Sequence, residues 1–361
     1  MTRPCCIARR PRLPARVSIA AWIVIVVAWL LGLGSDAWGA GREVSPFASE
    51  RGRVVRLDAR LDALLPATTR LETIASGHRW LEGPLWDART HSLLYSDIPA
   101  NAVYRWRADA AAPELFLAQS GYTGSAPYAG REPGSNGLVF DAQGRLVLCQ
   151  HGDRRIVRLE RDGTRTVLVD RYQGRRLNSP NDAIYASNGD LYFTDPPFGL
   201  PQAFDDPGRE LDVSGVYRLR ADGTLELLIA DLRAPNGIAL SPDERTLYVT
   251  DVADDRPAWY AYALVDGRPV SRRLLADAAA WTRVRRGGPD GLETDAAGNV
   301  FAAGPEAVYV FAPDGTLLGL VETGVPTANL AWGEDGSTLF IAADTEILKL
   351  RTSTRAPRWQ P

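Results

Sequence analysis

The sequence predicts an all-β protein, a six-bladed β-propeller closed by an N-terminal strand. Three observations carry this prediction: one unit recurs six times after residue 80, Asp-Gly pairs separate further strands between the units, and no helical periodicity of useful length follows the first 40 residues. Each unit starts with a distinctive pair of residues, continues as a short apolar strand, turns at Gly or Asp, and ends in a second apolar strand. Asp and Gly suit tight hairpins because both tolerate positive φ.

The six units are spaced as propeller blades are. They are LEGPLWDARTHSLLYSD (81–97), SNGLVFDAQGRLVLCQ (135–150), SPNDAIYASNGDLYFTD (179–195), PNGIALSPDERTLYVTD (235–251), PDGLETDAAGNVFAAG (289–304) and ANLAWGEDGSTLFIAAD (328–344). Asp-Gly pairs at 162–163, 222–223, 266–267 and 314–315 close a further hairpin in four of the intervals. Two hairpins make four strands, and a period of roughly 40–50 residues with four strands is typical of a propeller blade.

The last strand, EILKLRTS, has no outer partner within its own repeat. We predict that RLETIAS (70–76) supplies it and so closes the ring, because a free sheet edge invites aggregation. The expected organisation is an export signal at 1–40, a polar and irregular arm at 41–69, the propeller at 70–352 and a short tail at 353–361.

The first 40 residues resemble an export signal. Five arginines precede an apolar run from Val17 to Gly34, and the small residues Ala37 and Gly39 follow it. Positive start, apolar stretch and small-residue cleavage site are the three parts of such a signal. A retained membrane anchor is the alternative, since 18 apolar residues are just enough to span a bilayer. We expect a periplasmic or secreted protein whose mature domain does not bind the membrane unless the signal is retained as an anchor.

Composition excludes several classes of function. The net charge is −3 and the charged residues are mixed along the chain, so a nucleic-acid surface is not expected. Neither a GxxxxGK[ST] loop nor a GxSxG elbow occurs, which argues against P-loop nucleotide enzymes and serine hydrolases. Cys149 is the only cysteine beyond the signal, so the mature chain has no internal disulfide. With neither a coiled coil nor a long apolar helix, we expect a monomer.

The first residue of each innermost strand should point at the central channel. The six repeats place Glu82, Asn136, Asn181, Asn236, Asp290 and Ala328 there. Asn and Asp also serve in turns, which explains Asn136 but not Glu82. The other interpretation is a site for a hard cation such as Ca²⁺ or Mg²⁺, because carboxylate and amide oxygens are their usual ligands. A zinc site built from nitrogen and sulfur ligands is not expected, because the chain beyond the signal has only three histidines and Cys149 to supply them.

These motifs also carry a family resemblance. LEGPLWD, LNSPNDAIYASNGDLYFTDPPFGL, APNGIALSPDERTLYVTD and GGPDGLETDAAGNVF resemble the gluconolactonase branch of the SMP-30/gluconolactonase/luciferin-regenerating family, from about residue 70 to 350. The resemblance implies a six-bladed propeller with one divalent cation in the channel, Ca²⁺ first, with Mg²⁺, Mn²⁺ or Zn²⁺ as alternatives. It implies metal ligation by Glu82, Asn236 and Asp290, with Asn181 in or beside the metal shell. Several animal members have an Arg two residues before that Asn, where this chain has Ser179.

The resemblance further implies hydrolysis of a sugar lactone of the glucono-1,5-lactone type to the aldonic acid. The metal would polarise the carbonyl and Asp290 would act as general base. Direct attack by Asp290, or Glu82 as the base, stays open. We expect Asn136, Asn181, His151 and Arg154 to bind the substrate, against the alternative that His151 and Arg154 are a turn histidine and a surface arginine.

Two other functions stay open. One is phosphotriester or fluorophosphate hydrolysis at the same metal site, which the resemblance to the fluorophosphatases suggests. The other is a non-catalytic binding propeller, against which the five polar channel residues count. Asp97, Asp195 and Asp251 end equivalent strands, and this regularity favours structural hydrogen bonds. Trp86 and Trp332 are expected in the core between blades.

Overall fold

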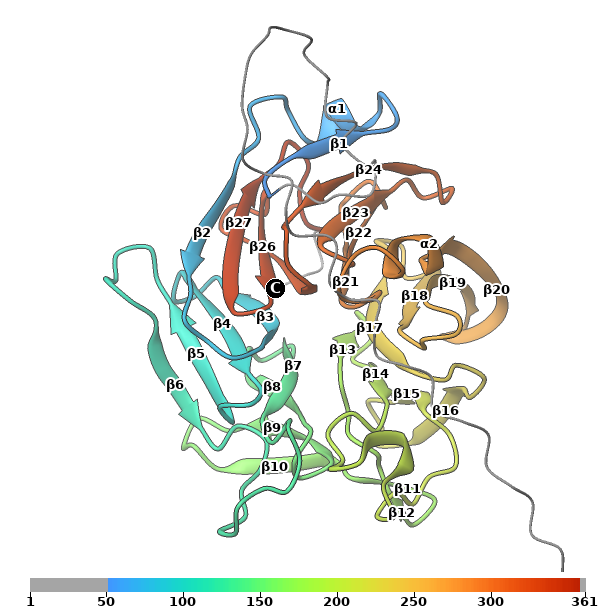
Figure 1. Ribbon diagram of the computed structural model, residues 1–361. Coiled ribbons are helices and arrows are strands. Elements are labelled where there is room, and N and C mark those ends of the chain that lie inside the picture. Colours follow the sequence, from blue (N-terminus) through green and yellow to red (C-terminus); the bar gives the residue numbers. More distant parts are fainter. Residues whose placement is uncertain (1–50, 358–361) are drawn as a thin grey trace, which may run out of the picture. The chain divides into compact units, whose positions relative to one another are not determined.

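The computed structural model describes residues 51–357, and these form a six-bladed β-propeller (Figure 1). The predicted export signal at 1–40 and the start of the arm at 41–50 lie outside the described residues. Within residues 51–357, no helix is both long and apolar enough to span a bilayer. The prediction of an all-β propeller is confirmed, and the helical pieces are short: α1 (Leu61–Leu64), α2 (Ala279–Thr282) and the 3₁₀ turn η1 (Ala203–Asp205).

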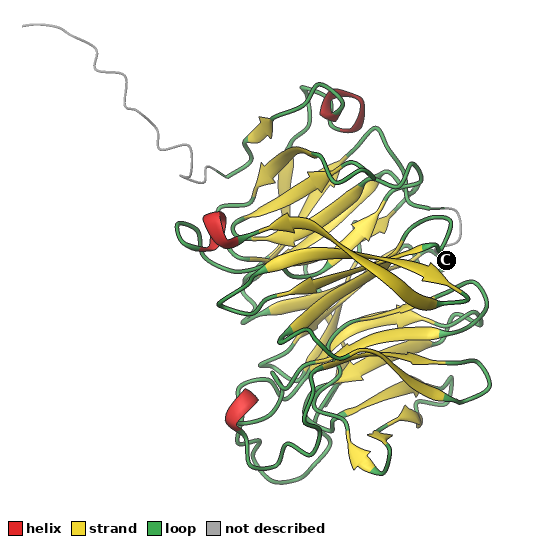
Figure 2. Ribbon diagram, turned by 90° about the vertical axis from the view of Figure 1, so that its right-hand side faces the viewer, coloured by secondary structure: helices red, strands yellow, loops and turns green. Residues whose placement is uncertain are grey.

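Each blade is an antiparallel sheet, and Figure 2 shows the strands of these sheets in yellow. Apart from two strands that come before blade 1 in the chain, the strands of a blade follow one another in sequence. Blade 1 contains β3 (Leu81–Asp87), β4 (Ser92–Asp97), β5 (Ala102–Trp106) and β6 (Glu114–Ala118). Blade 2 contains β7 (Ser135–Phe140), β8 (Leu146–Gln150), β9 (Arg155–Leu159) and β10 (Arg165–Val169). A small hairpin, β11 (Arg171–Tyr172) and β12 (Arg175–Arg176), then leads to blade 3, which contains β13 (Ala183–Tyr185), β14 (Leu191–Asp195), β15 (Gly215–Leu219) and β16 (Leu225–Ile229).

The second half of the ring repeats this plan. Blade 4 contains β17 (Pro235–Leu240), β18 (Thr246–Asp251), β19 (Ala258–Val265) and β20 (Arg268–Asp277). Blade 5 contains β21 (Leu292–Thr294), β22 (Val300–Gly304), β23 (Ala307–Phe311) and β24 (Leu317–Glu322). Blade 6 contains β25 (Thr327–Gly333), β26 (Thr338–Ala343) and β27 (Glu346–Arg351). The first strands of the six blades contact one another in sequence around the channel, so they are the innermost strands.

Strand β2 (Leu71–Ala75) closes the ring as predicted. It pairs antiparallel with β27, with Leu71 opposite Leu350 and Thr73 opposite Leu348. The outer strand of the last blade therefore comes from the chain segment that precedes the first blade. This pairing ties the two ends of the propeller together and leaves β27 without a free edge.

The segment before β2 is more ordered than the irregular arm that we expected. Strand β1 (Val54–Arg56) pairs with β24 and gives blade 5 a fifth strand. Leu61 and Leu65 are fully buried in the core shared by blades 5 and 6. Their spacing of four places both on one side of the short helix α1. Arg53 also donates two hydrogen bonds to the buried carboxylate of Glu322, at 2.7 and 2.9 Å.

Aromatic side chains fill the space between blades. Trp86 stacks on Phe340 with ring centroids 5.3 Å apart, which joins blade 1 to blade 6. Trp332 meets Phe301 edge-on at 5.1 Å, which joins blade 6 to blade 5. Both tryptophans therefore have the core role that the sequence predicts. Large aromatic rings in offset or edge-on contact stabilise such interfaces beyond their buried area.

Candidate active site in the central channel

The innermost strands are irregular at the predicted channel residues. The ladder shifts register between Glu82 and Leu85, between Ser135 and Leu138, between Pro235 and Ile238, and between Thr327 and Asn329. In blades 3 and 5 the regular strand starts only after Asp182 and Gly291. A bulge frees backbone groups from the ladder and changes the direction of a side chain, which is common beside active sites.

The freed backbone groups bond to the neighbouring blade and bring the channel residues together. Gly137 N–H donates to the Asn181 carbonyl at 2.7 Å, and Gly291 N–H donates to the Ala328 carbonyl at 2.7 Å. The hydroxyl groups of Ser96 and Thr194 donate to the carbonyls of Asn136 (2.9 Å) and Asn236 (2.6 Å). Four of the six junctions between neighbouring blades are thus held beside the channel residues.

The residue after each channel residue forms a second layer, and four blades have glycine there. These glycines are Gly83, Gly137, Gly237 and Gly291. A Cβ at Gly83 would lie 2.3 Å from the Asn136 carbonyl oxygen, and one at Gly237 would lie 2.4 Å from the Asp290 carbonyl oxygen. The strands therefore approach closely only because these positions carry no side chain.

The other two blades place side chains in this layer, Asp182 and Asn329. Ala328, the sixth predicted channel residue, is fully buried in a hydrophobic cluster and has no side-chain oxygen. Asn329 is the polar residue that blade 6 contributes to the second layer. Asp182 accepts hydrogen bonds from the backbone N–H groups of Ala183 (2.9 Å) and Ile238 (3.3 Å).

Three carboxylates of the channel influence one another. Burial and the nearby Asp182 raise the pKa of Glu82 to about 8, and burial raises the pKa of Asp182 to about 6. Burial, Glu82 and Asp182 raise the pKa of Asp290 well above its ordinary value. Glu132, outside the inner strands, adds to the rise at Glu82 and Asp290. Like charges in a buried site favour protonation, and a bound cation reverses this preference.

The oxygens of the channel fit a hard cation. Asn136 Oδ1 and Asp290 Oδ1 are buried and accept no hydrogen bond from a protein group in the described structure. Buried polar atoms normally have a hydrogen-bond partner, so a ligand is expected at each of these two oxygens. Within residues 51–357, no three His, Cys, Asp or Glu side chains form a set that could hold a metal. The predicted metal ligands are a different kind of set, because they combine the carboxylates of Glu82 and Asp290 with the amides of Asn181 and Asn236.

His151 is fully buried beside this channel. It follows β8, and its Nδ1 lies 2.9 Å from Glu132 Oε2. Both ring nitrogens are buried, and neither makes a regular hydrogen bond in the described part of the chain, so the contact with Glu132 is electrostatic. Glu132 also acts electrostatically on Glu82 and Asp290, which places the His151–Glu132 pair near the carboxylates. A carboxylate beside one ring nitrogen favours the proton there and leaves the other nitrogen as an acceptor.

Arg154 is buried too, but most of its hydrogen bonds are structural. Its Nε donates to the carbonyls of Leu177 (2.8 Å) and Asn178 (3.0 Å), and a terminal nitrogen donates to the Gly208 carbonyl at 2.8 Å. Its other terminal nitrogen is buried without a partner in the described structure. Arg154 therefore holds two loops together and keeps one buried terminal nitrogen without a partner in the described structure. Its role is neither that of a surface arginine nor that of a residue that only binds substrate.

Ser179 and the strand-end aspartates hold the loops around the channel. Ser179 Oγ donates to the Pro196 carbonyl (2.6 Å) and accepts from Gly199 N–H (2.9 Å). Asp195 accepts from Asn178 N–H at 2.8 Å, and Asp251 accepts from Ala234 N–H at 2.9 Å, in each case 17 residues earlier. Asp97 is the equivalent acceptor for Arg79 and Trp80. The structural interpretation of these aspartates is confirmed.

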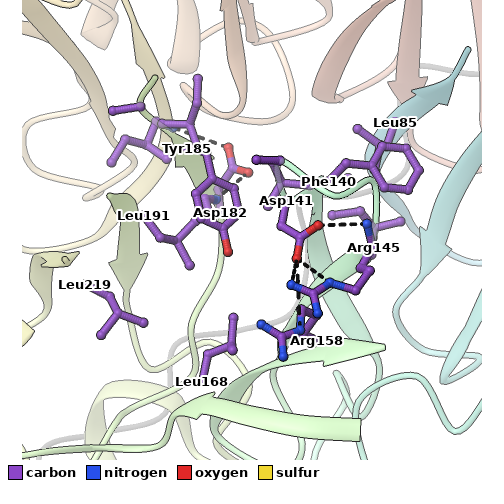
Figure 3. Close-up of a pocket in the computed structure, with 18 of the residues that line it drawn as sticks. Leu85, Phe140, Asp141, Arg145, Arg158, Leu168, Asp182, Tyr185, Leu191 and Leu219 are labelled. Atoms are coloured by element: carbon purple, nitrogen blue, oxygen red, sulfur yellow. Dashed lines mark hydrogen bonds and ion pairs between the residues drawn. The ribbon is translucent and has the colours of Figure 1, made fainter. Parts of the chain in front are cut away.

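A cavity of about 860 Å³ lies beyond the second layer, and it differs from the predicted site. Its walls include Leu85, Phe140, Asp182 and Tyr185 (Figure 3), and inner-strand residues of all six blades line it. Neither Glu82 nor Asp290 lines it. The arginines at this cavity, Arg145 and Arg158, are paired with the carboxylate of Asp141 (Figure 3). The cavity therefore runs along the same inner strands as the predicted site and reaches the second layer at Gly83, Asp182 and Asn329.

Sequence reasoning missed Asp182, Asn329 and Glu132 as site residues. Asp182 and Asn329 had a signal, because each replaces the glycine that four other repeats carry. Glu132 lies in an irregular loop, GREPGS, and no repeat has an equivalent residue. Only the fold brings it to His151.

Comparisons with known proteins agree with this architecture. The family model described as the SMP-30/Gluconolactonase/LRE-like region matches residues 80–345. A gluconolactonase of Zymomonas mobilis is 42% identical over 311 residues, which cover 84% of this chain and 87% of that protein. A gluconolactonase structure from Xanthomonas campestris has a TM-score of 0.72 and 35% identity, over 84% of this chain and 96% of that one.

A more distant structure shares the fold alone. Regucalcin from Agrobacterium tumefaciens matches with a TM-score of 0.62 and 18% identity, over 81% of this chain and 97% of that one. The family match spans all six blades, and the Zymomonas relative extends over most of both chains. The chain belongs to the SMP-30/gluconolactonase/luciferin-regenerating family.

Proposed function

We propose that this protein is an exported, metal-dependent lactonohydrolase that opens a sugar lactone of the glucono-1,5-lactone type to the aldonic acid. The channel residues Glu82, Asn181, Asn236 and Asp290 would hold one divalent cation, with Ca²⁺ as the first candidate. The observation that carries the proposal is a set of side-chain oxygen atoms around the channel that includes buried carboxylates. One of these atoms, Asp290 Oδ1, accepts no hydrogen bond in the described structure.

The class of reaction is supported by the relatives. The Zymomonas and Xanthomonas proteins, at 42% and 35% identity, are both gluconolactonases. Each match covers 84% of this chain, so it extends over most of the chain rather than over one shared motif. A lactonohydrolase that acts on a small sugar lactone is the function these relatives support.

The donor set suits a hard cation because every proposed ligand atom is an oxygen and two ligands are carboxylates. Neutralising Glu82 and Asp290 would remove the repulsion that raises the pKa of both groups. When bound, such a cation acts as a Lewis acid on the lactone carbonyl and stabilises the negative charge that develops there.

Asp290 is proposed as the general base. Ring opening needs a water molecule to lose a proton as it attacks the carbonyl carbon, and an unpartnered carboxylate oxygen can accept that proton. Asp290 Oδ1 is such an oxygen. The backbone of Asp290 is held beside blade 4 because its carbonyl packs against Gly237, where a Cβ would approach within 2.4 Å.

The hydroxyl groups of the sugar need hydrogen-bond partners at the same end of the channel. His151 Nε2, Asn136 Oδ1 and one terminal nitrogen of Arg154 are buried and unpartnered within the described residues. The Glu132 carboxylate, 2.9 Å from His151 Nδ1, would fix the ring so that Nε2 accepts a substrate hydroxyl. With Asn181, these groups form the proposed substrate-binding set.

The decisive experiment measures lactone opening by chelator-treated and Ca²⁺-loaded protein, with wild type and Asp290→Asn. We expect chelation to abolish turnover and Ca²⁺ to restore it. Loss of a general base lowers kcat by about 100-fold or more, which is the expected effect of Asp290→Asn. Asp295→Asn is the matched control, since Asp295 is a buried carboxylate of the same blade that bonds Asn299 and Thr354 outside the ring.

Asp295→Asn should retain the kcat of the wild type. Full-rate lactone opening by metal-free protein would contradict the metal mechanism. A kcat/KM for a phosphotriester that exceeds the value for the lactone would support the alternative hydrolase.

A further inference from the structure

The side-chain amide of Asn329 has a fixed orientation in the second layer of the channel. Its Oδ1 accepts the backbone N–H of Leu330 at 2.8 Å. The carbonyl side of the amide is thereby occupied, and the NH₂ side is left for other partners. The Asn329 side chain lies close enough to the carboxylates of Glu82 and Asp182 to lower the pKa of both groups. Because carboxylates accept and an amide NH₂ group has two donors, one N–H is available for each carboxylate.

The structure leaves no room for Asn329 to move toward blade 5. A Cβ at Gly291 would lie 2.1 Å from Asn329 Oδ1, 2.2 Å from its Cγ and 2.8 Å from its Nδ2. The amide thus packs directly against the backbone of the residue after Asp290. Asn329 is 6% exposed, so water does not compete strongly for its hydrogen bonds. Its contacts therefore join three blades: Glu82 of blade 1, Asp182 of blade 3 and Gly291 of blade 5.

We propose that Asn329 is a positioning residue that orients the Glu82 carboxylate for the cation, by donating one N–H to Glu82 and the other to Asp182. This inference rests on the cation site proposed above. The two carboxylates would otherwise repel each other in a buried space, where the charge of Asp182 acts on Glu82. A donor between them reduces their repulsion and fixes the carboxylate plane of Glu82, whose remaining lone pairs stay available to the ion.

The expected loss of cation affinity is taken from what is typical of other metal sites. Partners that hydrogen-bond to a metal ligand orient it, and their loss typically weakens metal affinity or activity about 10–100-fold. Asn329→Leu keeps the branched shape of the side chain, with larger methyl groups in place of the amide, and removes both donors. We expect this substitution to raise the Kd for Ca²⁺ by about 10–100-fold.

The test is calorimetric titration of chelator-treated, full-length protein with CaCl₂ alone, without substrate. Wild type, Asn329→Leu and Asn299→Leu are compared, with Tm of each metal-free protein measured in parallel. Asn299 is the matched control because it is also a buried amide that donates to a carboxylate, Asp295 Oδ2 at 2.8 Å, away from the ring. Asn299→Leu should lower Tm and leave the Kd for Ca²⁺ within about twofold of wild type, since distant sites act independently.

Equal Kd values for wild type and Asn329→Leu would overturn the proposal. So would an equal loss of affinity in Asn299→Leu, which would mean that the effect reports general destabilisation. If Asn329→Leu does not fold, Asn329→Ser decides, because its single hydroxyl donor should give an intermediate Kd, and an unchanged Kd overturns the proposal. Wild-type protein that binds Ca²⁺ but opens no lactone would refute the proposed function alone, whereas wild-type protein that binds no Ca²⁺ would refute both.

Discussion

The metal-free channel should make this protein less stable as the pH rises from about 5 to about 8. Burial and Asp182 raise the pKa of Glu82 from 4.5 to about 8 in the folded protein. In the unfolded chain the same group releases its proton near 4.5. Between these values the folded state binds more protons than the unfolded state, so the free energy of unfolding falls as the pH rises.

The magnitude follows from the pKa difference. Each pKa unit corresponds to about 1.4 kcal/mol, so the shift of Glu82 corresponds to about 5 kcal/mol, lost progressively between about pH 4.5 and pH 8. Asp182, whose pKa rises from 3.8 to about 6, contributes in the same direction over a lower range. This loss is a large fraction of the stability of an ordinary domain, about 5–15 kcal/mol. Bound Ca²⁺ should reverse the trend, since it requires ionised ligands.

The assay is urea denaturation in the presence of a chelator at pH 5 and pH 8, followed by tryptophan fluorescence. Wild-type protein should unfold at a lower urea concentration at pH 8, and Glu82→Gln should show a much smaller difference between the two pH values. Glu72→Gln, at an exposed glutamate of β2, is the control and should behave as wild type. An unfolding midpoint that is equal or higher at pH 8 in the metal-free wild type would refute the reasoning, as would an undiminished pH effect in Glu82→Gln.

Two further predictions concern residues outside the ring. Glu132→Gln removes the carboxylate charge 2.9 Å from His151 Nδ1, and kcat/KM for a lactone should fall about tenfold to a hundredfold, the range found when a charged polar partner is lost; an unchanged value in steady-state kinetics would argue against a role for His151. Leu61→Ala creates a cavity between blades 5 and 6 and should cost about 2–5 kcal/mol in denaturation, while the Kd for Ca²⁺ stays as in wild type. A stability equal to wild type would show that the segment before β2 is not part of the core.

Much of this protein could be predicted from local sequence patterns. The six repeated units identify the blades, and the unpaired last strand identifies β2 as its partner. The same repeats align Glu82, Asn136, Asn181, Asn236 and Asp290 at the start of their inner strands. Alternating apolar residues and Asp-Gly turns are local features, so each blade can be recognised without knowing its neighbours.

The contacts between blades were decided only in three dimensions. Asn329 meets Glu82 and Asp182, residues that are 247 and 147 positions earlier in the chain, because ring closure brings blade 6 beside blade 1. Glu132 meets His151 from an irregular loop that has no counterpart in the other repeats. By itself, the sequence determined the strands, their order and the polar character of the channel, since these depend on residues close together in the chain. Which of those polar groups touch, and which are left without a partner, depends on how six separately encoded sheets pack around one axis.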